Sequence, residues 1–425
     1  MAVVQQLAEA GHVAYFAGGC VRDELLGLQP TDYDIATDAT PDVVREVFGS
    51  RRTQAVGAAF GVMLVKQGRL QFEVATFRTD GSYSDGRRPD RVEYADAEAD
   101  ARRRDFTING LFRDPLAQAS DPDDDGVIDF VDGKRDLRKK VLRCIGRPFD
   151  RFAEDYLRLL RAVRFAARFG LTIERDTYEA IREHAPKLSA ISNERVGEEL
   201  RRMLTPPTRG EAWRLLWETR LIGVVLRTLP DPQPSISERR PILDAIARIP
   251  EPITVGLAAA ATAAEVCRQA GMPLRRLFEP DHANAIADAC RRALRLSNDL
   301  TDNVRGALDL HALLFDRFPP VSRLKRFLAA PHSDDARAML KAVSFDLSLA
   351  DRVAELELAF ESLLAKGDVA PPPLVTGDDL IAAGLRPGPA FKAALDAAYD
   401  AQLEDRVLTK EAALEVALLA ARVPT

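Results

Sequence analysis

Gly-Gly-Cys-Val-Arg-Asp at residues 18–23 precedes Thr-Asp-Tyr-Asp-Ile-Ala-Thr at residues 31–37, and these two motifs are the most informative about the N-terminal region. The glycine pair allows the backbone to approach a phosphate closely, and Arg22 follows it. Asp32 and Asp34 are two residues apart on a strand-like segment, so we expect their side chains on one face. Two carboxylates beside a phosphate-binding turn suit Mg²⁺ held against a triphosphate.

Length and composition indicate a globular protein of several domains. The chain has 425 residues, of which 46% are hydrophobic and 29% are charged. No apolar run is long enough to predict a membrane span, and no signal peptide is expected. The four cysteines are scattered without Cys-x-x-Cys spacing, which predicts a reduced, cytoplasmic protein with neither a zinc site nor a disulfide framework.

The distribution of charge leaves a nucleic-acid partner open. The net charge of -6 argues against such a partner. However, residues 134–168 carry twelve Lys or Arg against four Asp or Glu, a local excess of eight positive charges. This basic stretch fits either a surface for a phosphate backbone or a solvated helix face.

Hydrophobic patterning predicts an α/β head followed by helices. The expected strands are residues 13–17, 34–37, 61–66, 70–76 and 127–131. Between them we expect a helix at 41–47, with Thr40 as N-cap and Pro41 in the first position. Beyond residue 148 the pattern is helical, including residues 151–169, 175–184 and 194–204. Proline-rich breaks and these changes of pattern set the domain boundaries at 1–145, 146–206, 207–345 and 346–425.

The opening motifs closely resemble the catalytic signature of one enzyme family. This is the class II tRNA nucleotidyltransferase (CCA-adding enzyme) and bacterial poly(A) polymerase family, within the DNA polymerase β-like nucleotidyltransferases. The resemblance implies a nucleotidyltransferase sheet in the head, followed by an all-α neck, body and tail. It also implies that Asp32 and Asp34 hold Mg²⁺, and that Gly19 and Arg22 bind the nucleotide.

Two further segments extend the resemblance. Residues 73–78 end a strand-like run, and Glu73 is either a third carboxylate at the metal or a surface residue of an edge strand. Arg-Arg-Asp-Phe-Thr at residues 103–107 matches the family block that contacts ribose and phosphates. The Arg104 guanidinium suits triphosphate oxygens, and Asp105 can accept hydrogen bonds from ribose hydroxyls.

Two loops are interpreted separately. Residues 78–102 resemble the flexible loop that family members use in switching from cytidine to adenosine addition. Residues 121–132 match an EF-hand pattern in their acids and in Gly126. Because residues 127–131 look like a strand and a glycine turn follows the last acid, we interpret this segment as an acidic hairpin loop rather than a Ca²⁺ site.

Glu-Asp-Tyr-Leu-Arg at residues 154–158 matches the family's Glu-Asp-x-x-Arg motif for choosing the nucleotide. On one helix Asp155 and Arg158 would share a face. Asp155 only accepts hydrogen bonds and Arg158 only donates them, which fits the edges of cytosine and adenine and mismatches uracil and guanine. Arg161 and Arg164 continue at three-residue steps and would reach the triphosphate. Asn193 is the expected N-cap of the neck helix.

The sequence therefore predicts template-independent addition of C and A from CTP and ATP to the 3′ end of tRNA, with release of pyrophosphate. A poly(A) polymerase and an enzyme that adds only A share these motifs and stay as alternatives. A non-catalytic RNA-binding protein is a rival of another class, which the intact Asp32 and Asp34 oppose. The helical body and tail would bind tRNA by its shape and backbone.

Overall fold

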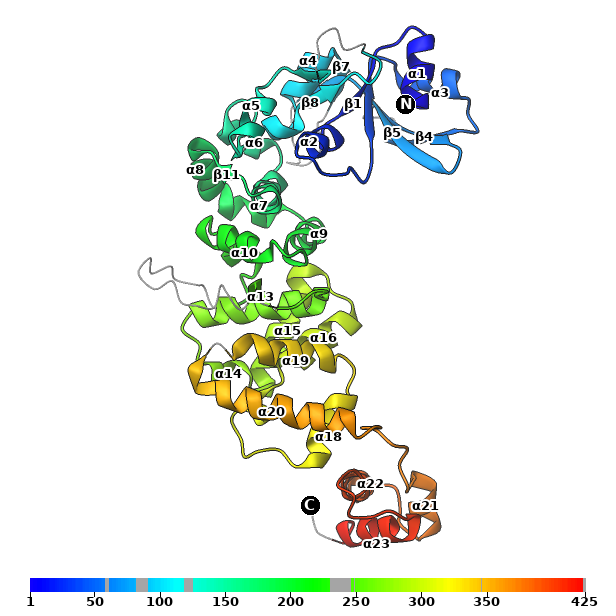
Figure 1. Ribbon diagram of the computed structural model, residues 1–425, viewed down its shortest axis with the longest axis vertical. Helices are drawn as coiled ribbons and strands as arrows, with labels where there is room; N and C mark the ends of the chain where they lie inside the picture. The colour runs from blue at the N-terminus through cyan, green and yellow to red at the C-terminus, as the bar shows by residue number, and fades with distance from the viewer. Residues whose placement is uncertain are drawn as a thin grey trace. The chain divides into compact units, whose positions relative to one another are not determined.

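A computed structural model describes residues 1–57, 61–81, 91–117, 125–229, 246–247, 249–344 and 346–422. The chain forms two compact units. One comprises Met1–Met203 and Glu211–Val225, and the other Leu204–Gly210 and Leu226–Thr425 (Figure 1). The finer division into head, neck, body and tail stays a prediction. No helix of the described segments has both the length and the apolar character to cross a membrane.

A mixed seven-stranded sheet forms the head, in the order β3-β4-β5-β2-β1-β8-β9. Its strands are β1 (Ala14–Ala17), β2 (Asp34–Thr37), β3 (Thr53–Gly57), β4 (Val62–Gln67), β5 (Leu70–Thr76), β8 (Leu111–Arg113) and β9 (Val127–Asp129). Strand β5 runs parallel to β2, and the other neighbouring pairs are antiparallel. The predicted α/β head is confirmed, and each predicted strand lies within two residues of an observed one.

Helices cover both faces of this sheet. Helices α1 (Ala2–Glu9) and α3 (Pro41–Phe48) pack on one face, where Ile35 of β2 joins their apolar side chains. Ala36, the next residue, packs on the other face with Ala101 of α4 (Ala97–Arg102). Because strand side chains alternate, Asp34 lies on the same face as Ala36. Pro41 opens α3 as predicted, whereas the Thr40 side chain makes no capping hydrogen bond.

The region after the head is mainly helical, as predicted. Its helices up to residue 225 are α5 (Gly133–Arg138), α6 (Pro148–Glu154), α7 (Leu157–Phe169), α8 (Arg175–His184), α9 (Asn193–Leu204), α10 (Arg209–Glu218) and α11 (Leu221–Val225). The head itself also contains helix α2 (Gly19–Leu25). Three details differ from expectation. The single helix expected at 151–169 is two helices. A short strand, β11 (Thr172–Ile173), pairs with β10 (Val141–Leu142). Helix α9 begins at Asn193, so Asn193 is its first residue rather than its cap.

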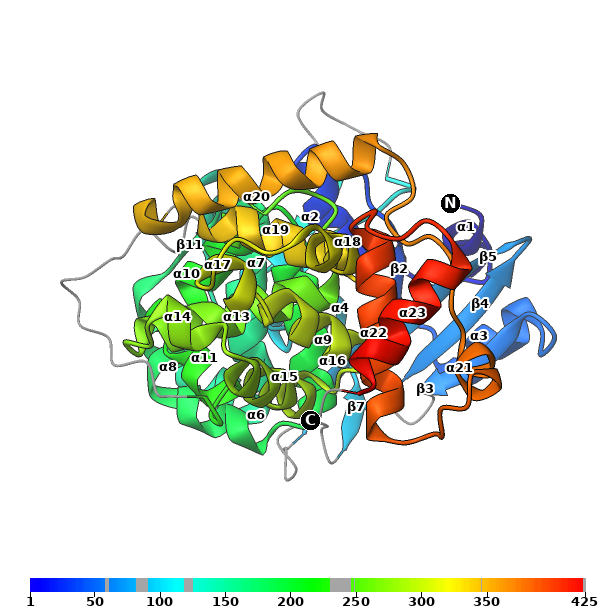
Figure 2. The same ribbon diagram turned by 90° about the horizontal axis from the view of Figure 1, so that it is seen from below.

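The second unit is built from helices. They are α13 (Val255–Gln269), α14 (Leu274–Leu277), α15 (Pro280–Leu294), α16 (Asn298–Leu308), α17 (His311–Leu314), α18 (Val321–Ala329), α19 (Ser333–Val343), α20 (Leu347–Ala365), α21 (Gly377–Ala382), α22 (Pro389–Leu403) and α23 (Lys410–Ala420). Helix α20 packs with α17, α18 and α19, whereas a separate apolar cluster of residues 375–417 joins α21, α22 and α23. Helices α22 and α23 lie side by side in Figure 2.

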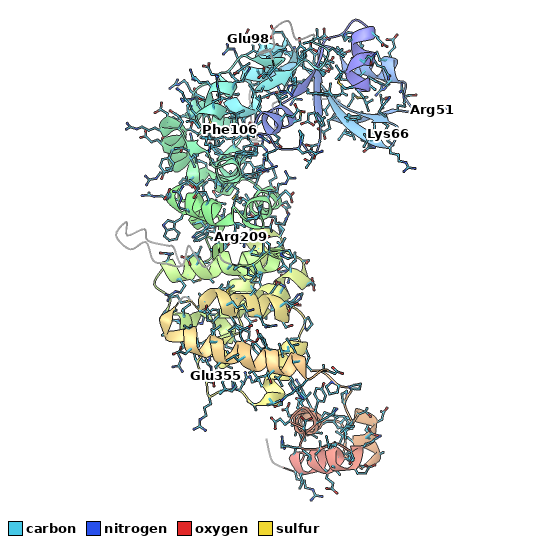
Figure 3. All side chains as sticks on the ribbon, in the orientation of Figure 1. Arg51, Lys66, Glu98, Phe106, Arg209 and Glu355 are labelled. Atoms are coloured by element: carbon cyan, nitrogen blue, oxygen red, sulfur yellow. The ribbon has the colours of Figure 1, made fainter. Side chains whose placement is uncertain are left out.

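Arg209 anchors the start of α10 within this second unit (Figure 3). Its side chain is buried and donates hydrogen bonds to the carbonyl oxygens of Ile246 at 2.8 Å and Pro206 at 3.2 Å. Glu251 pairs with the same guanidinium. A buried arginine is stable only when its donors are satisfied, so these acceptors hold the neighbouring segments together.

Glu265 is a buried acid on α13, a helix that is apolar on nearly all sides. The residue is 1% exposed, and its Oε1 accepts a hydrogen bond from Gln269 at 2.5 Å. Within the described residues its Oε2 has no hydrogen-bond partner. Burial therefore raises the pKa of Glu265 from 4.5 to about 7.

We predict that Glu265 makes the fold less stable as pH rises. The unfolded chain releases this proton near pH 4.5, whereas the folded protein keeps it until about pH 7, so the free energy of unfolding falls across this window. The effect should reach about 3 kcal/mol. Urea unfolding at about pH 5 and about pH 8 measures it. Glu265→Gln should lose this part of the pH dependence, and Glu355→Gln, at an exposed glutamate of α20, should keep it. Equal pH dependence in Glu265→Gln and the parent chain would contradict the assignment.

Candidate active site

The glycine turn between β1 and α2 lies against an arginine of a distant motif. Gly18 has a φ of 69°, in the left-handed region that favours glycine, and its N–H donates to the Leu111 carbonyl at 2.8 Å. A Cβ at Gly18 would lie 2.7 Å from Nη1 of Arg104. Glycine is therefore required both for the backbone conformation and for the space that Arg104 occupies. Gly19 follows as the first residue of α2.

The predicted carboxylates gather at the start of β2. Asp34 is its first residue, whereas Asp32 precedes the strand, so only Asp34 has the expected strand position. Ile35 pairs with Val74 in the parallel β2–β5 ladder, which puts Glu73 beside Asp34 on the same face. Partial burial and the negative charges of Glu73 and Asp32 raise the pKa of Asp34 to about 6. After burial, the charges of Glu73 and Asp32 are the next causes of this shift, so the three carboxylates interact at this position.

This donor set fits a divalent cation that the substrate also helps to bind. In the described part of the chain, no three His, Cys, Asp or Glu side chains are grouped closely enough to hold a metal by themselves. Mg²⁺ commonly takes one or two protein carboxylates and fills its remaining positions with water and substrate phosphates. Asp32 and Asp34, which interact electrostatically with each other and with Glu73, meet that requirement.

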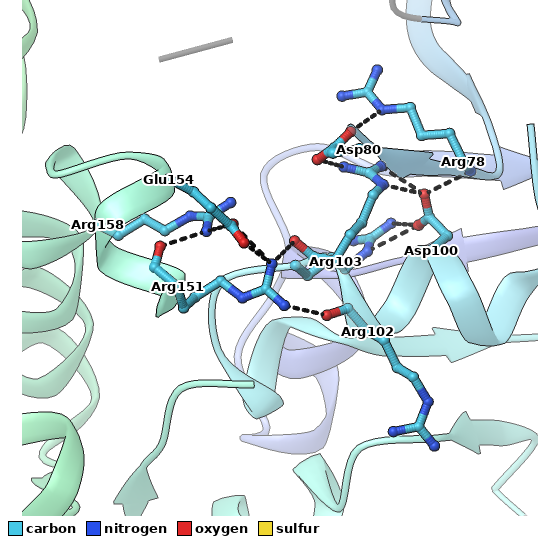
Figure 4. Close-up of polar contacts among 9 residues, drawn as sticks. Arg78, Asp80, Asp100, Arg102, Arg103, Arg151, Glu154 and Arg158 are labelled. Atoms are coloured by element: carbon cyan, nitrogen blue, oxygen red, sulfur yellow. Dashed lines mark hydrogen bonds and ion pairs between the residues drawn. The ribbon is translucent and has the colours of Figure 1, made fainter. Parts of the chain in front are cut away.

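Asp100 orients the arginines of the 103–107 motif, and the sequence analysis did not single it out. It is 1% exposed. Its Oδ1 accepts from Arg103 Nη2 at 2.6 Å, and its Oδ2 accepts from Arg104 Nη2 at 2.9 Å (Figure 4). Arg103 also pairs with Asp80 at 3.6 Å. An acid three and four residues before two arginines is a helical pairing signal that could have identified Asp100.

Asp105 is the acceptor at the centre of the site. Its Oδ1 accepts from the Phe106 N–H at 2.9 Å and from Asn109 Nδ2 at 3.0 Å, and its Oδ2 accepts from Arg161 Nε at 2.8 Å. Burial alone would raise its pKa, but the Arg161 charge and the Asn109 hydrogen bond hold the pKa of Asp105 at about 2. In this structure Asp105 positions Arg161 and Asn109, and the expected ribose contact stays a prediction.

Asp155 and Arg158 do not share one helix, which corrects the sequence-based expectation. Asp155 is extended (φ −150°, ψ 105°) in the break between α6 and α7, and Arg158 lies in the first turn of α7. Asp155 Oδ1 accepts from the Leu157 N–H at 3.0 Å. Aspartate side chains readily bond to the backbone two residues ahead, which competes with a continuous helix.

Each member of this pair has an internal partner. Arg195 Nη2 of α9 donates to Asp155 Oδ2 at 2.7 Å. Arg158 Nη1 donates to Glu154 Oε2 at 2.5 Å. Both side chains are mostly buried, with 15% of Asp155 and 11% of Arg158 exposed. Glu154 was quoted in the motif without a role, and no local pattern in the sequence pointed to Arg195.

An aromatic ring lies under the remaining guanidinium groups. Arg161 and Arg164 of α7 have their guanidinium carbons 5.1 and 4.6 Å from the centre of the Phe165 ring, and Arg22 lies at 5.2 Å. Arg22 is buried and donates through Nε and Nη2 to Asp23 at 2.8 and 2.6 Å. The structure thus brings Arg22, Arg161 and Arg164 together, as predicted for a polyanion site.

Arg164 is the most buried arginine of this group on α7. It pairs with Glu199 of α9 at 3.1 Å, and burial lowers the pKa of Arg164 to about 10. The guanidinium nevertheless stays charged at neutral pH. Any contact of Arg164 with a triphosphate would therefore have to be made alongside Glu199.

The two loops are only partly described. Residues 82–90, in the expected flexible loop, lie outside the described residues, and β6 (Arg78–Asp80) pairs with β7 (Val92–Tyr94) on either side of them. Residues 121–124 of the EF-hand-like pattern also lie outside. Asp125 accepts from Lys134 Nζ at 2.8 Å, and Asp129 accepts from the N–H groups of Gly133 and Lys134. These two acids serve the β8–β9 hairpin and the turn after it.

The chain is similar to known families and proteins over most of its length. Residues 14–143 match the model of the poly(A) polymerase head domain, and residues 170–231 match a probable RNA- and SrmB-binding site of polymerase A. The CCA-adding enzyme of Lacticaseibacillus paracasei is 33% identical over 407 residues, which cover 96% of this chain and 90% of that enzyme. The enzyme of Bacillus subtilis is 43% identical over 220 residues, about half of each chain.

A solved structure extends the likeness to the whole fold. The crystal structure of the Bacillus stearothermophilus CCA-adding enzyme in complex with CTP has a TM-score of 0.69 and 29% sequence identity, and it covers 97% of this chain and 95% of its own. The resemblance inferred from the motifs is therefore confirmed. The chain belongs to the CCA-adding enzyme family of nucleotidyltransferases.

Proposed function

We propose that this protein adds C and A from CTP and ATP to the 3′ end of tRNA, without a nucleic-acid template and with release of pyrophosphate. The observation that carries the proposal is the arrangement of Asp155 and Arg158. Arg195 holds the Asp155 carboxylate and Glu154 holds the Arg158 guanidinium, so an acceptor and a donor are fixed three residues apart in the chain.

This acceptor and donor fit only some bases. Cytosine and adenine offer an amino donor beside a ring-nitrogen acceptor, whereas uracil and guanine offer a carbonyl acceptor beside an N–H donor. A mismatched base leaves buried polar groups unpaired, at a cost of about 1–3 kcal/mol for each group. CTP, which is bound in the crystal structure of the Bacillus stearothermophilus relative, is one of the two nucleotides that this pairing accepts.

We further propose that Asp32 and Asp34 hold Mg²⁺, with Glu73 as a neighbouring third carboxylate. Bound there, Mg²⁺ would activate the RNA 3′-hydroxyl and stabilise the leaving pyrophosphate. Gly19, Arg22, Arg104, Arg161 and Arg164 would bind the triphosphate. Among them Arg104 has the best-supported position, because its guanidinium lies against the glycine turn. Asp105 keeps Arg161 in place and would accept hydrogen bonds from the ribose hydroxyls.

The protein would act in the cytoplasm. All four cysteines are free and buried, in keeping with a reducing compartment.

The helical C-terminal unit would bind tRNA. RNA duplexes are recognised mainly by shape and backbone, which a helical surface can match. The match of residues 170–231 to a probable RNA-binding site supports an RNA substrate.

One experiment separates the proposed function from its alternatives. The protein is incubated with Mg²⁺ and tRNAs that end before the first C or after CC, or with an unrelated RNA, and CTP and ATP are offered separately. We expect CTP to be used on the shortest tRNA and ATP after CC. Use of ATP alone after CC would indicate an A-adding enzyme, long A tails on unrelated RNA a poly(A) polymerase, and no incorporation a non-catalytic RNA-binding protein.

Asp34→Asn should reduce nucleotide incorporation by roughly a thousandfold or more, because it removes a charged ligand from the metal site. Incorporation of CTP into tRNA measures the effect. Asp42→Asn, at an exposed aspartate in the first turn of α3, is the matched control and should keep its activity. Full activity of Asp34→Asn would overturn the metal assignment.

Asp155→Ala should relax the choice of base, because it removes the acceptor that an amino group of C or A needs. We expect the preference for CTP over UTP, compared as kcat/KM, to fall roughly tenfold to a hundredfold. Asp150→Ala, at an exposed aspartate on the neighbouring α6, should leave the preference intact. An unchanged preference in Asp155→Ala would refute the role of this carboxylate in base selection.

A further inference from the structure

Arg151 lies outside the nucleotide-binding residues assigned above, yet its guanidinium joins two parts of the site (Figure 4). Its Nη2 donates to the Arg102 carbonyl at 2.8 Å, and its Nη1 donates to the Arg103 carbonyl at 3.3 Å. These carbonyls belong to the backbone directly before Arg104. The Nε of Arg151 also donates to the Ile145 carbonyl at 3.2 Å.

The same guanidinium reaches the base-selecting motif. Nη1 of Arg151 donates to the two carboxylate oxygens of Glu154 at 3.1 and 2.9 Å. Glu154 in turn accepts from Arg158 Nη1 at 2.5 Å, and the same nitrogen donates to the Arg151 carbonyl at 2.8 Å. Arg158 is therefore tied to Arg151 twice, once through Glu154 and once through the backbone.

The far side of this network is equally fixed. Arg103 and Arg104 both bond to Asp100, which is buried on α4. The backbone that Arg151 contacts therefore cannot shift without disturbing Arg104. Side chains in such a network act together, and loss of one member leaves buried polar groups unpaired.

Only an arginine can make this set of contacts. A guanidinium has five N–H donors in one plane, and Arg151 uses them toward three carbonyls and one carboxylate. A lysine ammonium is a compact charge on a flexible stem and cannot span acceptors in these separate directions. With 16% of its side chain exposed, Arg151 is partly shielded from water, which strengthens these bonds.

We propose that Arg151 is a positioning residue that sets Arg158 at a fixed place relative to the backbone carrying Arg104, so that base selection and triphosphate alignment depend on one another. This inference rests on the proposed function, because it takes Arg158 as the base-selecting donor and Arg104 as a triphosphate ligand. If Arg151 only fastened α6 to the head, its loss would lower stability without changing the choice of base.

The test compares the full chain with Arg151→Lys, Glu154→Gln and Arg147→Lys. Arg147 is the matched control, since it lies four residues away and is 85% exposed. The measurements are kcat and KM for CTP and UTP on a tRNA that lacks its 3′ CCA, the dissociation constants of both nucleotides without tRNA, and the thermal unfolding midpoint. Nucleotide binding without tRNA reports base choice independently of turnover.

We expect Arg151→Lys to lower the preference for CTP over UTP about tenfold, in both kcat/KM and binding. Glu154→Gln keeps the side-chain volume and removes the charge between Arg151 and Arg158, so it should act in the same direction if Arg151→Lys does not fold. Arg147→Lys should match the parent chain.

Two results would be adverse, and they are distinguishable. If the parent chain itself does not prefer CTP over UTP, the proposed function fails. The second result is that the parent chain prefers CTP, and that Arg151→Lys and Glu154→Gln both fold and prefer CTP over UTP to the same degree, with only the unfolding midpoint lowered. In that case Arg151 is structural and the inference is overturned.

Discussion

The ion pair between Asp105 and Arg161 connects the segment after α4 in the head to helix α7, and it sets where the other side chains of the site lie. Arg161 Nε lies 2.8 Å from Asp105 Oδ2, although the two residues are 56 positions apart in the sequence. The pKa of Asp105 is held at about 2, so the carboxylate stays charged wherever the protein is folded. Removing one partner of a buried pair leaves an uncompensated charge, which makes such a pair costly to break. The pair therefore fixes α7, with Arg158 and Arg164, against the motif that contains Arg104.

The site contains two regions of opposite charge. Around Asp34 the charge is negative, because Asp32 and Glu73 lie nearby, and burial together with these two charges raises the pKa of Asp34 to about 6. Along α7 the charge is positive, and the guanidinium groups of Arg22, Arg161 and Arg164 lie over the ring of Phe165. A magnesium–triphosphate complex carries charges of both signs and can satisfy both regions at once. This complementarity explains why carboxylates and guanidinium groups occur together in one site.

Local motifs predicted much of this arrangement, and long-range pairing set the remainder. The glycine turn, the strand that carries Asp34 and the arginine series on α7 follow from short patterns and are present in the structure. The helix break at Asp155 was missed because the apolar spacing continues across it, while the deciding hydrogen bond to Leu157 belongs to one side chain. Arg195 reaches Asp155 from 40 residues away, and no local pattern encodes that contact.

The internal acid partners of the arginines would prepare the proposed site for a nucleotide rather than block it. Arg104 donates through Nε and Nη2 to Asp100 and through Nη1 to the Asn109 carbonyl, which uses three of its five N–H groups. Arg22 likewise donates three N–H groups, to Asp23 and Asn109. With respect to the described residues, Arg22 and Arg104 would each keep two N–H groups for phosphate oxygens while an acid holds the guanidinium in place. Binding then requires little reorganisation of these side chains, and groups that are oriented beforehand stabilise developing charge most effectively.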